Sequence, residues 1–577
     1  MINFKEDEYL SKLNHSCAHL LAQAVKRLYP QAKFWVGPVI EGGFYYDIDL
    51  GEEVISEGDL EKIEEEMHRC AKEESPIIRK ELSREEAIKM FKNDSYKEDL
   101  ISRMPEGEVI SIYSQNDFTD LCRGPHVDNT KELKYFKLIK TSGAYWKGDS
   151  HNKMLQRIYG VCFKSDKQMK EHLKFLEEAK KRDHRKIGQE LNIFMISDYG
   201  RGFPIWLPNG TIMLKELEDY WYEVHQRAGY EMLRTPTILS KELWVKSGHW
   251  DNYKENMYTT MIDGEEYAIK PMNCPGGMLA YNNTIHSYRE LPLRFGEWGH
   301  VHRHEASGAL SGLFRVRAFT QDDAHIFLRY DQIEEEVLNI LSIVDEMYKT
   351  FGFDYKIYFS TRPEKKFIGT IEDWDDAERR LENGLKKANK PYKINKGDGA
   401  FYGPKIDICI LDSLGREWQC STIQLDMQLP ERFDVNYIDE NGKKVRPAIL
   451  HRTIYGSFER FMGILIEHYA GAFPIWLAPI QIAVLPINSE LHSEYALSIY
   501  KSLKDKGVRV ILDNTPNKFN YRLRDTQMKK IPVTLIVGDS EIENKEVSFR
   551  LFGEKKTTTL SKDAFLDYVL KHLHERD

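Results

Sequence analysis

The residue pattern changes three times along the chain, and the four stretches that result differ too much to share a single hydrophobic core. The chain has 577 residues, whereas one domain usually has about 100–200, so three or four domains are expected. A first region covers 1–165, a highly charged segment covers 166–194, and two further regions cover 195–473 and 474–577. We therefore predict a multidomain protein that combines α/β and α+β folds.

The first region and the charged segment differ in their apolar periodicity. An amphipathic helix is expected at HSCAHLLAQAVKRLYP, and strands are expected at FWVGPVI and GGFYYDIDL, which together predict an N-terminal α+β domain. The charged segment has few apolar residues, chiefly Leu173 and Leu176, and its basic residues cluster late. We predict that it forms one solvated connecting helix.

The last two regions predict different sheets. Residues 195–473 contain short strands between Gly and Pro, and FYGPKIDICILDSLGREWQCSTIQLDMQL predicts a hairpin that turns at 412–415, so an antiparallel sheet is expected. There is no G-x-G-x-x-G and no Walker loop, so a nucleotide would need another kind of site. From 474 onward strands and helices alternate regularly, which predicts a small α/β domain with a mainly parallel sheet.

The composition excludes several classes of protein. No apolar run approaches the roughly 20 residues of a membrane span, and the charged start MINFKEDEYLSKLNHSC has no apolar leader. Seven scattered cysteines suit free thiols or metal ligands in a reducing compartment, so we expect a cytoplasmic protein with no membrane partner. The net charge of −9 means that an RNA partner would need local basic patches.

Ligand-type side chains of the first region fall in two short segments. His15 and His19 are four residues apart, so a helix would project them from one face. Cys122 and His126 are also four apart, but the Gly-Pro pair between them favours a loop. The four suit a tetrahedral zinc site, or a metal-free site that positions water and moves a proton. The alternative is that the two helical histidines are incidental.

A second possible ligand set consists of Cys274, His325 and His451. Their separations match no zinc finger or knuckle. A lone Cys before Pro, or a His within an apolar strand, is more often simply packed. Spacing alone therefore does not support a metal site here.

The segments around these residues resemble a known family. RHEASGALSGLFRVRAFTQDDAHIF and HRTIYGSFERF resemble motifs 2 and 3 of the class II aminoacyl-tRNA synthetases, and KPMNCPG, STRPEKKFIGT, GAFYGPKID and WLAPIQ are similar to threonyl-tRNA synthetases. HSCAH and CRGPH resemble the editing domain of that family. The resemblance covers nearly the whole chain. It implies ATP-dependent ligation of L-threonine to tRNA(Thr) through a threonyl-adenylate, with Mg²⁺ accompanying ATP, and hydrolysis of mischarged Ser-tRNA(Thr).

The resemblance also implies residues for ATP. Arg303 would hold the α-phosphate, because a planar guanidinium suits a pair of phosphate oxygens and stabilises transition-state charge. Glu305 would meet the adenine amino group, Phe319 would stack on the ring, and Arg460 would contact the γ-phosphate. The implied catalytic residues are Arg303, Arg460 and Lys405, and the implied ATP-binding residues are Arg303, Glu305, Arg315, Phe319, Gln419 and Arg460.

In this family Cys274, His325 and His451 become ligands of one zinc ion per subunit, with an open coordination position. The implied role of the metal is to bind the amino and hydroxyl groups of threonine, and Asp323 would accept a hydrogen bond from the hydroxyl. The implied threonine-binding residues are Met272, Gln321, Asp323, Tyr402 and Gln424.

This chemistry explains why a second, editing site is expected. Valine has no hydroxyl group to bind, but serine keeps both chelating groups and lacks only a methyl, which is worth about 1–3 kcal/mol. That is too little for accurate translation, so mischarged seryl-tRNA must be hydrolysed. By analogy the site works without a metal, although its residue types leave zinc open. The implied editing residues are His15, His19, Lys97, Asp120, Cys122 and His126.

RNA contacts and a dimer are implied elsewhere. VHQRAGYEMLRTPTI resembles motif 1, a dimer interface in this class, so a homodimer is expected. The run AKKRDHRK at 179–186 is one candidate RNA contact. A basic C-terminal helix is another, with a solvated helix face as the alternative. Its candidate anticodon residues are Arg522, Arg524, Lys529 and Lys530, with Arg550 and Glu541 nearby.

The sequence departs from the family pattern in two places. HSCAH begins at His15, so the small ubiquitin-like domain that many members carry before it is expected to be absent. The usual CPGH string reads CPGG, with Gly277 in place of His.

Two rival functions are a stand-alone hydrolase of mischarged tRNA and a non-catalytic RNA-binding paralogue. The intact Arg303, Arg460 and zinc set argue against both.

Overall fold

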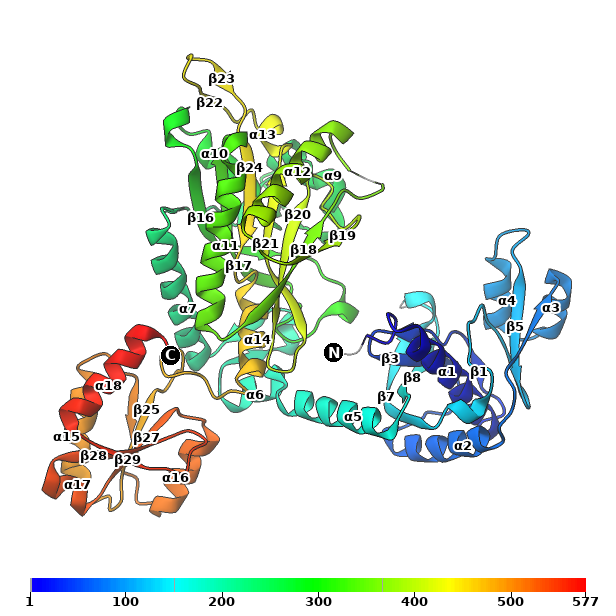
Figure 1. Cartoon of the computed structure of the whole chain (residues 1–577), viewed down its shortest axis with the longest axis horizontal. Helices are drawn as coiled ribbons and strands as arrows, with labels where there is room; N and C mark the ends of the chain where they lie inside the picture. The colour runs from blue at the N-terminus through cyan, green and yellow to red at the C-terminus, as the bar shows by residue number, and fades with distance from the viewer. Residues whose placement is uncertain (1–2, 150, 366) are drawn as a thin grey trace. The chain divides into compact units, whose positions relative to one another are not determined.

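A computed structural model of the chain describes residues 3–149, 151–365 and 367–577. The chain divides into two compact units, the first ending at Glu178 and the second running Ala179–Asp577. Figure 1 shows the first in blue to cyan and the second in green to red. Within the described residues, no helix is long and apolar enough to span a membrane.

The first unit is built on a long helix, α1 (Glu8–Leu28), that packs against an antiparallel sheet of order β1-β3-β8-β7. Asp7 caps the helix by accepting the Leu10 N–H, and the apolar face of α1 is buried in the core of the unit. A smaller sheet of order β4-β5-β6 carries α3 and α4. The elements are β1 (Lys33–Phe34), β2 (Val39–Ile40), β3 (Gly43–Asp49), α2 (Leu60–Lys72), β4 (Ile78–Leu82), α3 (Arg84–Met90), α4 (Ser95–Ser102), β5 (Ile110–Gln115), β6 (Phe118–Leu121), β7 (Tyr135–Tyr145) and β8 (Met154–Phe163).

The connecting segment is not the single solvated helix that the sequence predicts. It forms two helices, α5 (Asp166–Lys181) and α6 (His184–Glu190). The chain leaves helical geometry at Asp183, whose side chain accepts the Arg185 N–H and so caps the second helix. The α6 helix is also not fully solvated, because His184 and Ile187 are buried.

The second unit contains an eight-stranded sheet of order β11-β16-β17-β24-β21-β20-β18-β19. Neighbouring strands are antiparallel except at its two edges, β11–β16 and β18–β19. The expected hairpin is confirmed, with its turn at Asp412–Gly415. The strands are β11 (Glu231–Met232), β16 (Leu293–His302), β17 (Ala318–Leu328), β18 (Asp354–Ser360), β19 (Tyr392–Asn395), β20 (Lys405–Leu411), β21 (Glu417–Asp426) and β24 (Ala448–Thr453).

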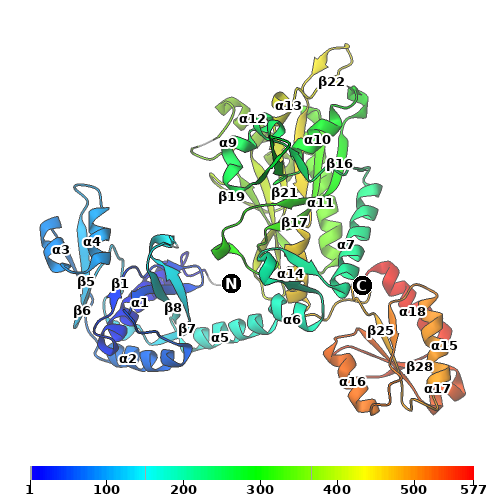
Figure 2. The ribbon, with the colours of Figure 1, turned by 180° about the vertical axis from the view of Figure 1, so that it is seen from behind.

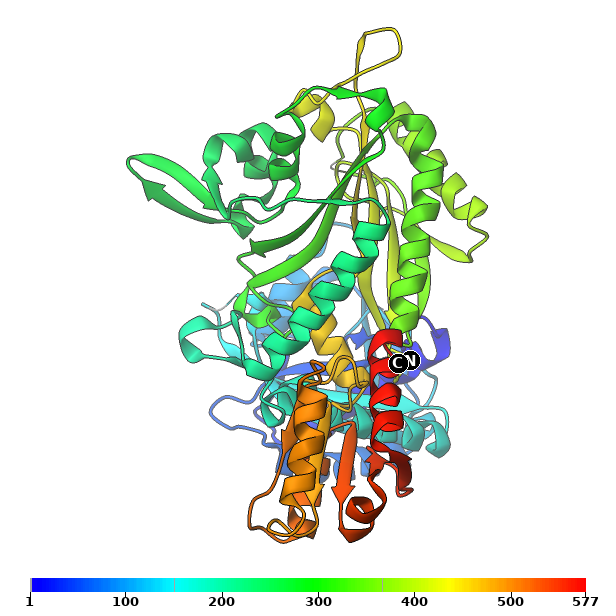
Figure 3. The ribbon, with the colours of Figure 1, turned by 90° about the vertical axis from the view of Figure 1, so that its left-hand side faces the viewer.

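The two faces of this sheet carry different side chains, apolar on one and polar on the other, because side chains alternate along a strand. On β17, Ala324 and Ile326 face the main apolar core with the long helices, whereas Asp323 and His325 point to the opposite face. Figures 2 and 3 show the long helices α7 and α11 running beside the sheet. The helices are α7 (Pro208–Arg227), α10 (Cys274–Tyr281), α11 (Ile333–Thr350), α12 (Ile371–Lys387) and α14 (Phe458–His468).

The C-terminal part contains a five-stranded sheet of order β26-β25-β27-β28-β29. It is mixed rather than mainly parallel, because only the pairs of β25 with β26 and β27 are parallel. Helices α15 and α18 lie on one face and α16 on the other (Figures 1 and 2). The elements are β25 (Ile482–Pro486), α15 (Ser493–Lys504), β26 (Val510–Leu512), α16 (Phe519–Met528), β27 (Val533–Val537), α17 (Asp539–Asn544), β28 (Glu546–Leu551), β29 (Thr558–Ser561) and α18 (Lys562–Glu575).

Candidate active site

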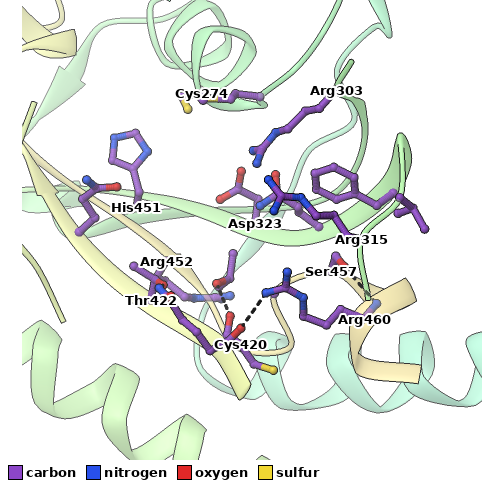
Figure 4. A pocket seen from close by; sticks show the side chains of 18 of the residues that line it. Cys274, Arg303, Arg315, Asp323, Cys420, Thr422, His451, Arg452, Ser457 and Arg460 are labelled. Carbon is purple, nitrogen blue, oxygen red and sulfur yellow. Dashed lines mark hydrogen bonds between the residues drawn. The ribbon is translucent and has the colours of Figure 1, made fainter. Parts of the chain in front are cut away.

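The polar face of the eight-stranded sheet carries a cavity of about 530 Å³. Figure 4 shows Cys274 and His451 at one end of it, and Arg315, Ser457 and Arg460 at the other. Strands β17, β21 and β24 supply its floor, and Cys274 is the first residue of α10. The predicted residues that line it are Met272, Cys274, Arg303, Glu305, Arg315, Phe319, Gln321, Asp323, Tyr402, Gln419, Gln424, His451 and Arg460.

Three buried ligand-type side chains meet at the first end. One candidate ligand atom from each of Cys274, His325 and His451 lies within 4.8 Å of the other two. His325 and His451 are cross-strand partners on β17 and β24, and their ring centroids are 4.9 Å apart. A thiolate with two imidazoles is a donor set that zinc prefers.

The protonation of His325 suits a metal, whereas His451 would have to release a proton to bind one. Burial lowers the pKa of His325 to about 3, so its ring is neutral, and its Nε2 has no hydrogen-bond partner in the described part of the chain. Nε2 of His451 lies 2.9 Å from Oδ2 of the buried Asp426. Burial lowers the pKa of His451, but hydrogen bonds with Asp426 and Cys274 outweigh it and raise the pKa to about 10. A carboxylate behind a metal-ligating histidine orients its ring.

Gly277 lies directly against this cluster. A Cβ atom at residue 277 would stand 3.2 Å from Nδ1 of His325. A residue larger than glycine here would therefore require His325 to shift by a few tenths of an ångström.

The predicted threonine-binding residues lie beside the cluster. Asn273 donates from Nδ2 to Oδ2 of Asp323 at 3.2 Å, which leaves Oδ1 of this carboxylate for a ligand. Burial raises the pKa of Asp323. Tyr402 donates its hydroxyl hydrogen to Oε1 of Gln424 at 3.0 Å. Polar groups of this kind suit a small ligand that carries a hydroxyl and an amino group.

The other end of the cavity is lined by arginines. The guanidinium of Arg303 lies 5.0 Å from the centroid of the Phe319 ring, and Arg315 pairs with Glu305 at 3.0 Å. Arg460 donates from Nε to the carbonyl oxygen of Phe314 at 3.1 Å and from Nη1 to that of Gln419 at 3.3 Å. These bonds fix the direction of the side chain before a ligand arrives.

Lys405 is the one predicted catalytic residue that does not line this cavity. Its ammonium group lies 2.7 Å from Asp407 and 3.1 Å from Asp398. Asp407 in turn accepts a hydrogen bond from Gln419 at 2.6 Å. The ammonium group of Lys405 is therefore linked to the cavity through Asp407, which also accepts a hydrogen bond from Thr422 in the lining.

Two carboxylates that the sequence analysis missed support the site from below. Asp426 holds His451, as described above, and it follows Gln424 on the same face of β21. Asp322 is fully buried and accepts the N–H groups of Ile454, Tyr455 and Gly456. It also accepts the indole N–H of Trp221 at 3.1 Å. For Asp322 the sequence does carry a signal, because it lies on the apolar face of a strand, where an unpaired carboxylate would be very unfavourable.

The first unit holds a second cluster. One candidate ligand atom from each of His15, His19, Cys122 and His126 lies within 4.8 Å of the others. Nδ1 of His15 lies 3.2 Å from the Pro125 carbonyl oxygen, which can only accept, so this nitrogen carries the proton. Nε2 of His15 is then free to accept, and it lies 3.3 Å from Sγ of Cys122.

His126 has the same tautomer. The Ser16 hydroxyl donates to the Lys12 carbonyl oxygen at 2.8 Å, so Ser16 Oγ accepts from Nδ1 of His126 at 3.1 Å. Nε2 of His126 is thus unprotonated and lies 3.1 Å from Sγ of Cys122. Two imidazole lone pairs therefore face one thiol.

A buried acid–base pair adjoins this cluster. Oδ1 of Asp120 lies 2.5 Å from the ammonium of Lys97, and both side chains are buried. Tyr46 donates its hydroxyl hydrogen to the same carboxylate. Nε2 of His19 is 4.0 Å from Oδ2 of Asp120. Tyr46 was missed because a tyrosine in an apolar strand gives no sign of its partner.

Two of the residues predicted to contact RNA, Arg522 and Lys530, instead bond to backbone carbonyl oxygens within the protein, which corrects the prediction for them. Arg522 is 2% exposed, and its guanidinium donates to the carbonyl oxygens of Asp513, Pro486 and Asn517, so it cannot read a base. It was misassigned because the sequence of α16 does not show which face packs on the sheet. Lys530 donates to the Ala470 carbonyl oxygen.

The remaining candidates differ in accessibility. Arg524 and Lys529 are exposed. Glu541 accepts the Gly538 N–H and the Ser548 hydroxyl, which ties its carboxylate to the start of α17. In the 179–186 run, Arg182 and His184 point into the second unit, whereas Arg185 and Lys186 are exposed.

Comparison with known proteins matches three segments of the chain to known domains. Residues 258–469 match the tRNA synthetase class II core domain (G, H, P, S and T), residues 481–572 match the anticodon binding domain, and residues 110–159 match the threonyl and alanyl tRNA synthetase second additional domain. With the antiparallel sheet and its arginine-lined cavity, these matches define a class II aminoacyl-tRNA synthetase, and the predicted fold class is confirmed.

Whole-chain relatives narrow this class to one family. The chain is 53% identical to the threonine–tRNA ligase of Clostridioides difficile over 100% of this chain and 90% of that protein. It is 55% identical to that of Fusobacterium nucleatum over 97% and 90%. The chain belongs to the threonine–tRNA ligase family and joins threonine to tRNA.

Solved structures give the same result. The RNA binding domain of threonyl-tRNA synthetase from Cryptosporidium parvum has a TM-score of 0.65 and 39% identity, and covers 67% of this chain and 98% of its own. A putative threonyl-tRNA synthetase from Aeropyrum pernix has a TM-score of 0.62 and 31% identity, and covers 68% of this chain and 96% of its own.

Proposed function

We propose that the chain activates L-threonine as threonyl-adenylate in the 530 Å³ cavity and then transfers it to tRNA(Thr). The observation that carries this proposal is the meeting of Cys274, His325 and His451 within 4.8 Å at one end of a cavity whose other end holds Arg460. The two ends suit an amino acid and a triphosphate, whose reacting groups would meet near Arg303.

The ATP end supplies charge stabilisation. Arg303 and Arg460 would bind the phosphates, because guanidinium groups fixed before the reaction stabilise charge that develops on phosphate oxygens. Glu305 would accept a hydrogen bond from the adenine amino group, and Phe319 would pack against the ring. Lys405 would act on the positions of Gln419 and Thr422, in both cases through Asp407. Mg²⁺ would accompany ATP and neutralise part of its charge.

The threonine end selects a hydroxyl group. Cys274, His325 and His451 would hold one zinc ion, which when bound would supply a Lewis acid for the amino and hydroxyl groups of threonine. Asp323 would accept a hydrogen bond from the same hydroxyl, and Asn273 would keep that carboxylate in place. Valine would leave these polar groups unpaired, which supports strong rejection of valine but only weak rejection of serine.

We further propose that the first unit hydrolyses Ser-tRNA(Thr). His15 and His126 present unprotonated Nε2 atoms, which can accept a proton from an attacking water. Lys97, held by Asp120, would stabilise the negative charge that develops on the ester carbonyl. Cys122 stands between the two imidazoles; burial raises the pKa of its thiol to about 12, which supports positioning rather than nucleophilic attack.

The proposed assembly is a homodimer. Tyr199 is fully exposed, and Met195, Ile205 and Ile238 are about half exposed, although all four are large apolar side chains. Of these four, Ile238 belongs to motif 1, and uncovered apolar groups support an interface with a second copy. Light scattering should then give twice the chain mass, and Tyr199→Glu should lower it. The seven unpaired cysteines support a reducing compartment such as the cytoplasm.

Threonine-dependent ATP–pyrophosphate exchange tests the central proposal. Exchange should be rapid with threonine, measurable with serine and near background with valine. Absence of threonine-dependent exchange would show that the cavity does not form an adenylate. Equal exchange with valine would show that no hydroxyl is recognised.

A further inference from the structure

His184 lies outside the cavity and belongs to neither proposed site, yet it is fully engaged inside the protein. It is 2% exposed and stands at the first turn of α6, the helix that follows the connecting helix α5. With Asp183 and Glu467 it forms a third group of ligand-type side chains. A metal is an unsuitable occupant, because both ring nitrogens of His184 already have protein partners.

Those partners fix the tautomer of His184. The backbone N–H of Leu313 donates to Nε2 at 2.9 Å, so Nε2 carries no proton. Nδ1 therefore carries it and donates to Oε1 of Glu467 at 2.7 Å. Glu467 accepts a further bond from Arg416 at 2.6 Å. The imidazole is thus clamped between α14 and the loop before β17.

The same loop reaches the ATP end of the cavity one residue later. The Phe314 ring packs between His184 and Trp418, with centroid distances of 4.2 and 4.3 Å. The carbonyl oxygen of Phe314 accepts the Nε–H of Arg460 at 3.1 Å. A displacement of Phe314 would therefore release Arg460 from one of its two carbonyl partners.

Gly312 shows how closely the loop approaches His184. Its φ is +50°, and a Cβ atom there would stand 2.2 Å from Nε2 of His184. Only a glycine lets the backbone pass over the ring at this distance. The contact between the ring and the loop is therefore close and specific.

We propose that His184 is a positioning residue for adenylation: its contacts with Leu313 and Phe314 fix the carbonyl that orients Arg460. The inference rests on the proposed role of Arg460 toward ATP. Because α6 directly follows α5, the contacts of His184 also link the connecting segment to the ATP end of the cavity.

Two substitutions at residue 184 separate this role from simple packing. A glutamine can place its Oε1 near the position of Nε2 and still accept the Leu313 N–H, but it loses the bond to Glu467. An asparagine can keep the bond to Glu467 but is too short to reach Leu313. Positioning through the loop predicts that His184→Gln retains function and His184→Asn does not, whereas anchoring of α6 through Glu467 predicts the reverse.

The test is steady-state ATP–pyrophosphate exchange by the full chain. His184→Asn should raise KM for ATP about tenfold with little change in KM for threonine, and His184→Gln should stay within about threefold of the parent. Gly312→Ala, which pushes on the ring from the loop side, should reproduce the asparagine result. Gln189→Ala, an exposed position on the same helix, is the matched control and should change nothing.

Each result decides a different point. Unchanged KM for ATP in both His184→Asn and Gly312→Ala, or a better result for Asn than for Gln, would overturn the inference. Circular dichroism and thermal unfolding identify a variant that does not fold. If His184→Asn is such a variant, the KM for ATP of Gly312→Ala compared with that of His184→Gln tests the inference instead. A parent protein without any exchange would instead contradict the proposed adenylation.

Discussion

His325 on β17 and His451 on β24 stand directly opposite each other across an antiparallel strand pair, with ring centroids 4.9 Å apart. Cys274 meets them from the start of α10, a third and separate element. Residues far apart in the chain thus form one buried donor set, because the sheet register brings them together. The thiol can be removed without changing that register, so the proposed metal site can be tested by a single substitution.

The metal content of the purified chain should be about one zinc per subunit. Cys274→Ser should lower it to near zero, because the thiolate is one of only three protein ligands. Cys122→Ser should leave it unchanged, since the proposed editing cluster works without metal. Elemental analysis after gel filtration measures both. About two zinc ions in the parent, with one lost in Cys122→Ser, would instead place a metal in the first unit.

Replacing Asp322 should destabilise the second unit. Its carboxylate accepts three backbone N–H groups and one indole N–H, and an asparagine would direct an NH₂ group at some of these donors. Leaving buried donors unpaired should lower the unfolding free energy by about 3 kcal/mol or more in Asp322→Asn. Denaturant unfolding measures it. Asp198→Asn, at an exposed carboxylate, is the control, and equal stability of the two variants would refute the argument.

His15→Ala should separate editing from charging. It removes an imidazole whose Nε2 faces Cys122, and the charging cavity does not include it. Threonylation of tRNA should therefore proceed at the parental rate, while Ser-tRNA(Thr) accumulates because its hydrolysis slows by about 10²-fold or more. Both are measured with labelled amino acids. Clearance of seryl-tRNA at the parental rate would remove His15 from the editing site.

The pH dependence of editing follows from the burial of the cluster. Burial lowers the pKa of His15, His19 and His126 below the ordinary value of about 6.5. Neutral imidazole is the active form, and a lowered pKa keeps it neutral to lower pH. Enzymatic hydrolysis of Ser-tRNA, corrected for the uncatalysed reaction, should thus lose little rate between about pH 7.5 and 6.5. An acid limb centred at or above about 6.5 would contradict this.

The sequence predicted the catalytic core well where local pattern decides structure. The hairpin that turns at Asp412–Gly415 follows from period-two patterning and turn residues. The ligand set did not follow from spacing, because register between distant strands has no local signal. The resemblance to a family supplied it.

The incorrect and missed predictions share one physical cause: the local sequence does not show which residues a side chain will pack against. Arg522 looks like a solvated basic residue until α16 is packed on its sheet, where four backbone carbonyl oxygens accept hydrogen bonds from the guanidinium. Asp183 ends one helix and caps the next, although the surrounding charge pattern continues without interruption. The partners of Asp322 and Asp426 likewise become identifiable only once the strands and helices are packed together.

The most direct test of the account is threonine-dependent ATP–pyrophosphate exchange by the parent chain, Cys274→Ser and Cys409→Ser, the last a thiol outside the cavity. The account predicts rapid exchange by the parent and by Cys409→Ser, and a loss of about 10²-fold or more in kcat/KM for threonine in Cys274→Ser. Exchange by Cys274→Ser at the parental rate would contradict the claim that this thiol, with His325 and His451, forms the site that selects threonine.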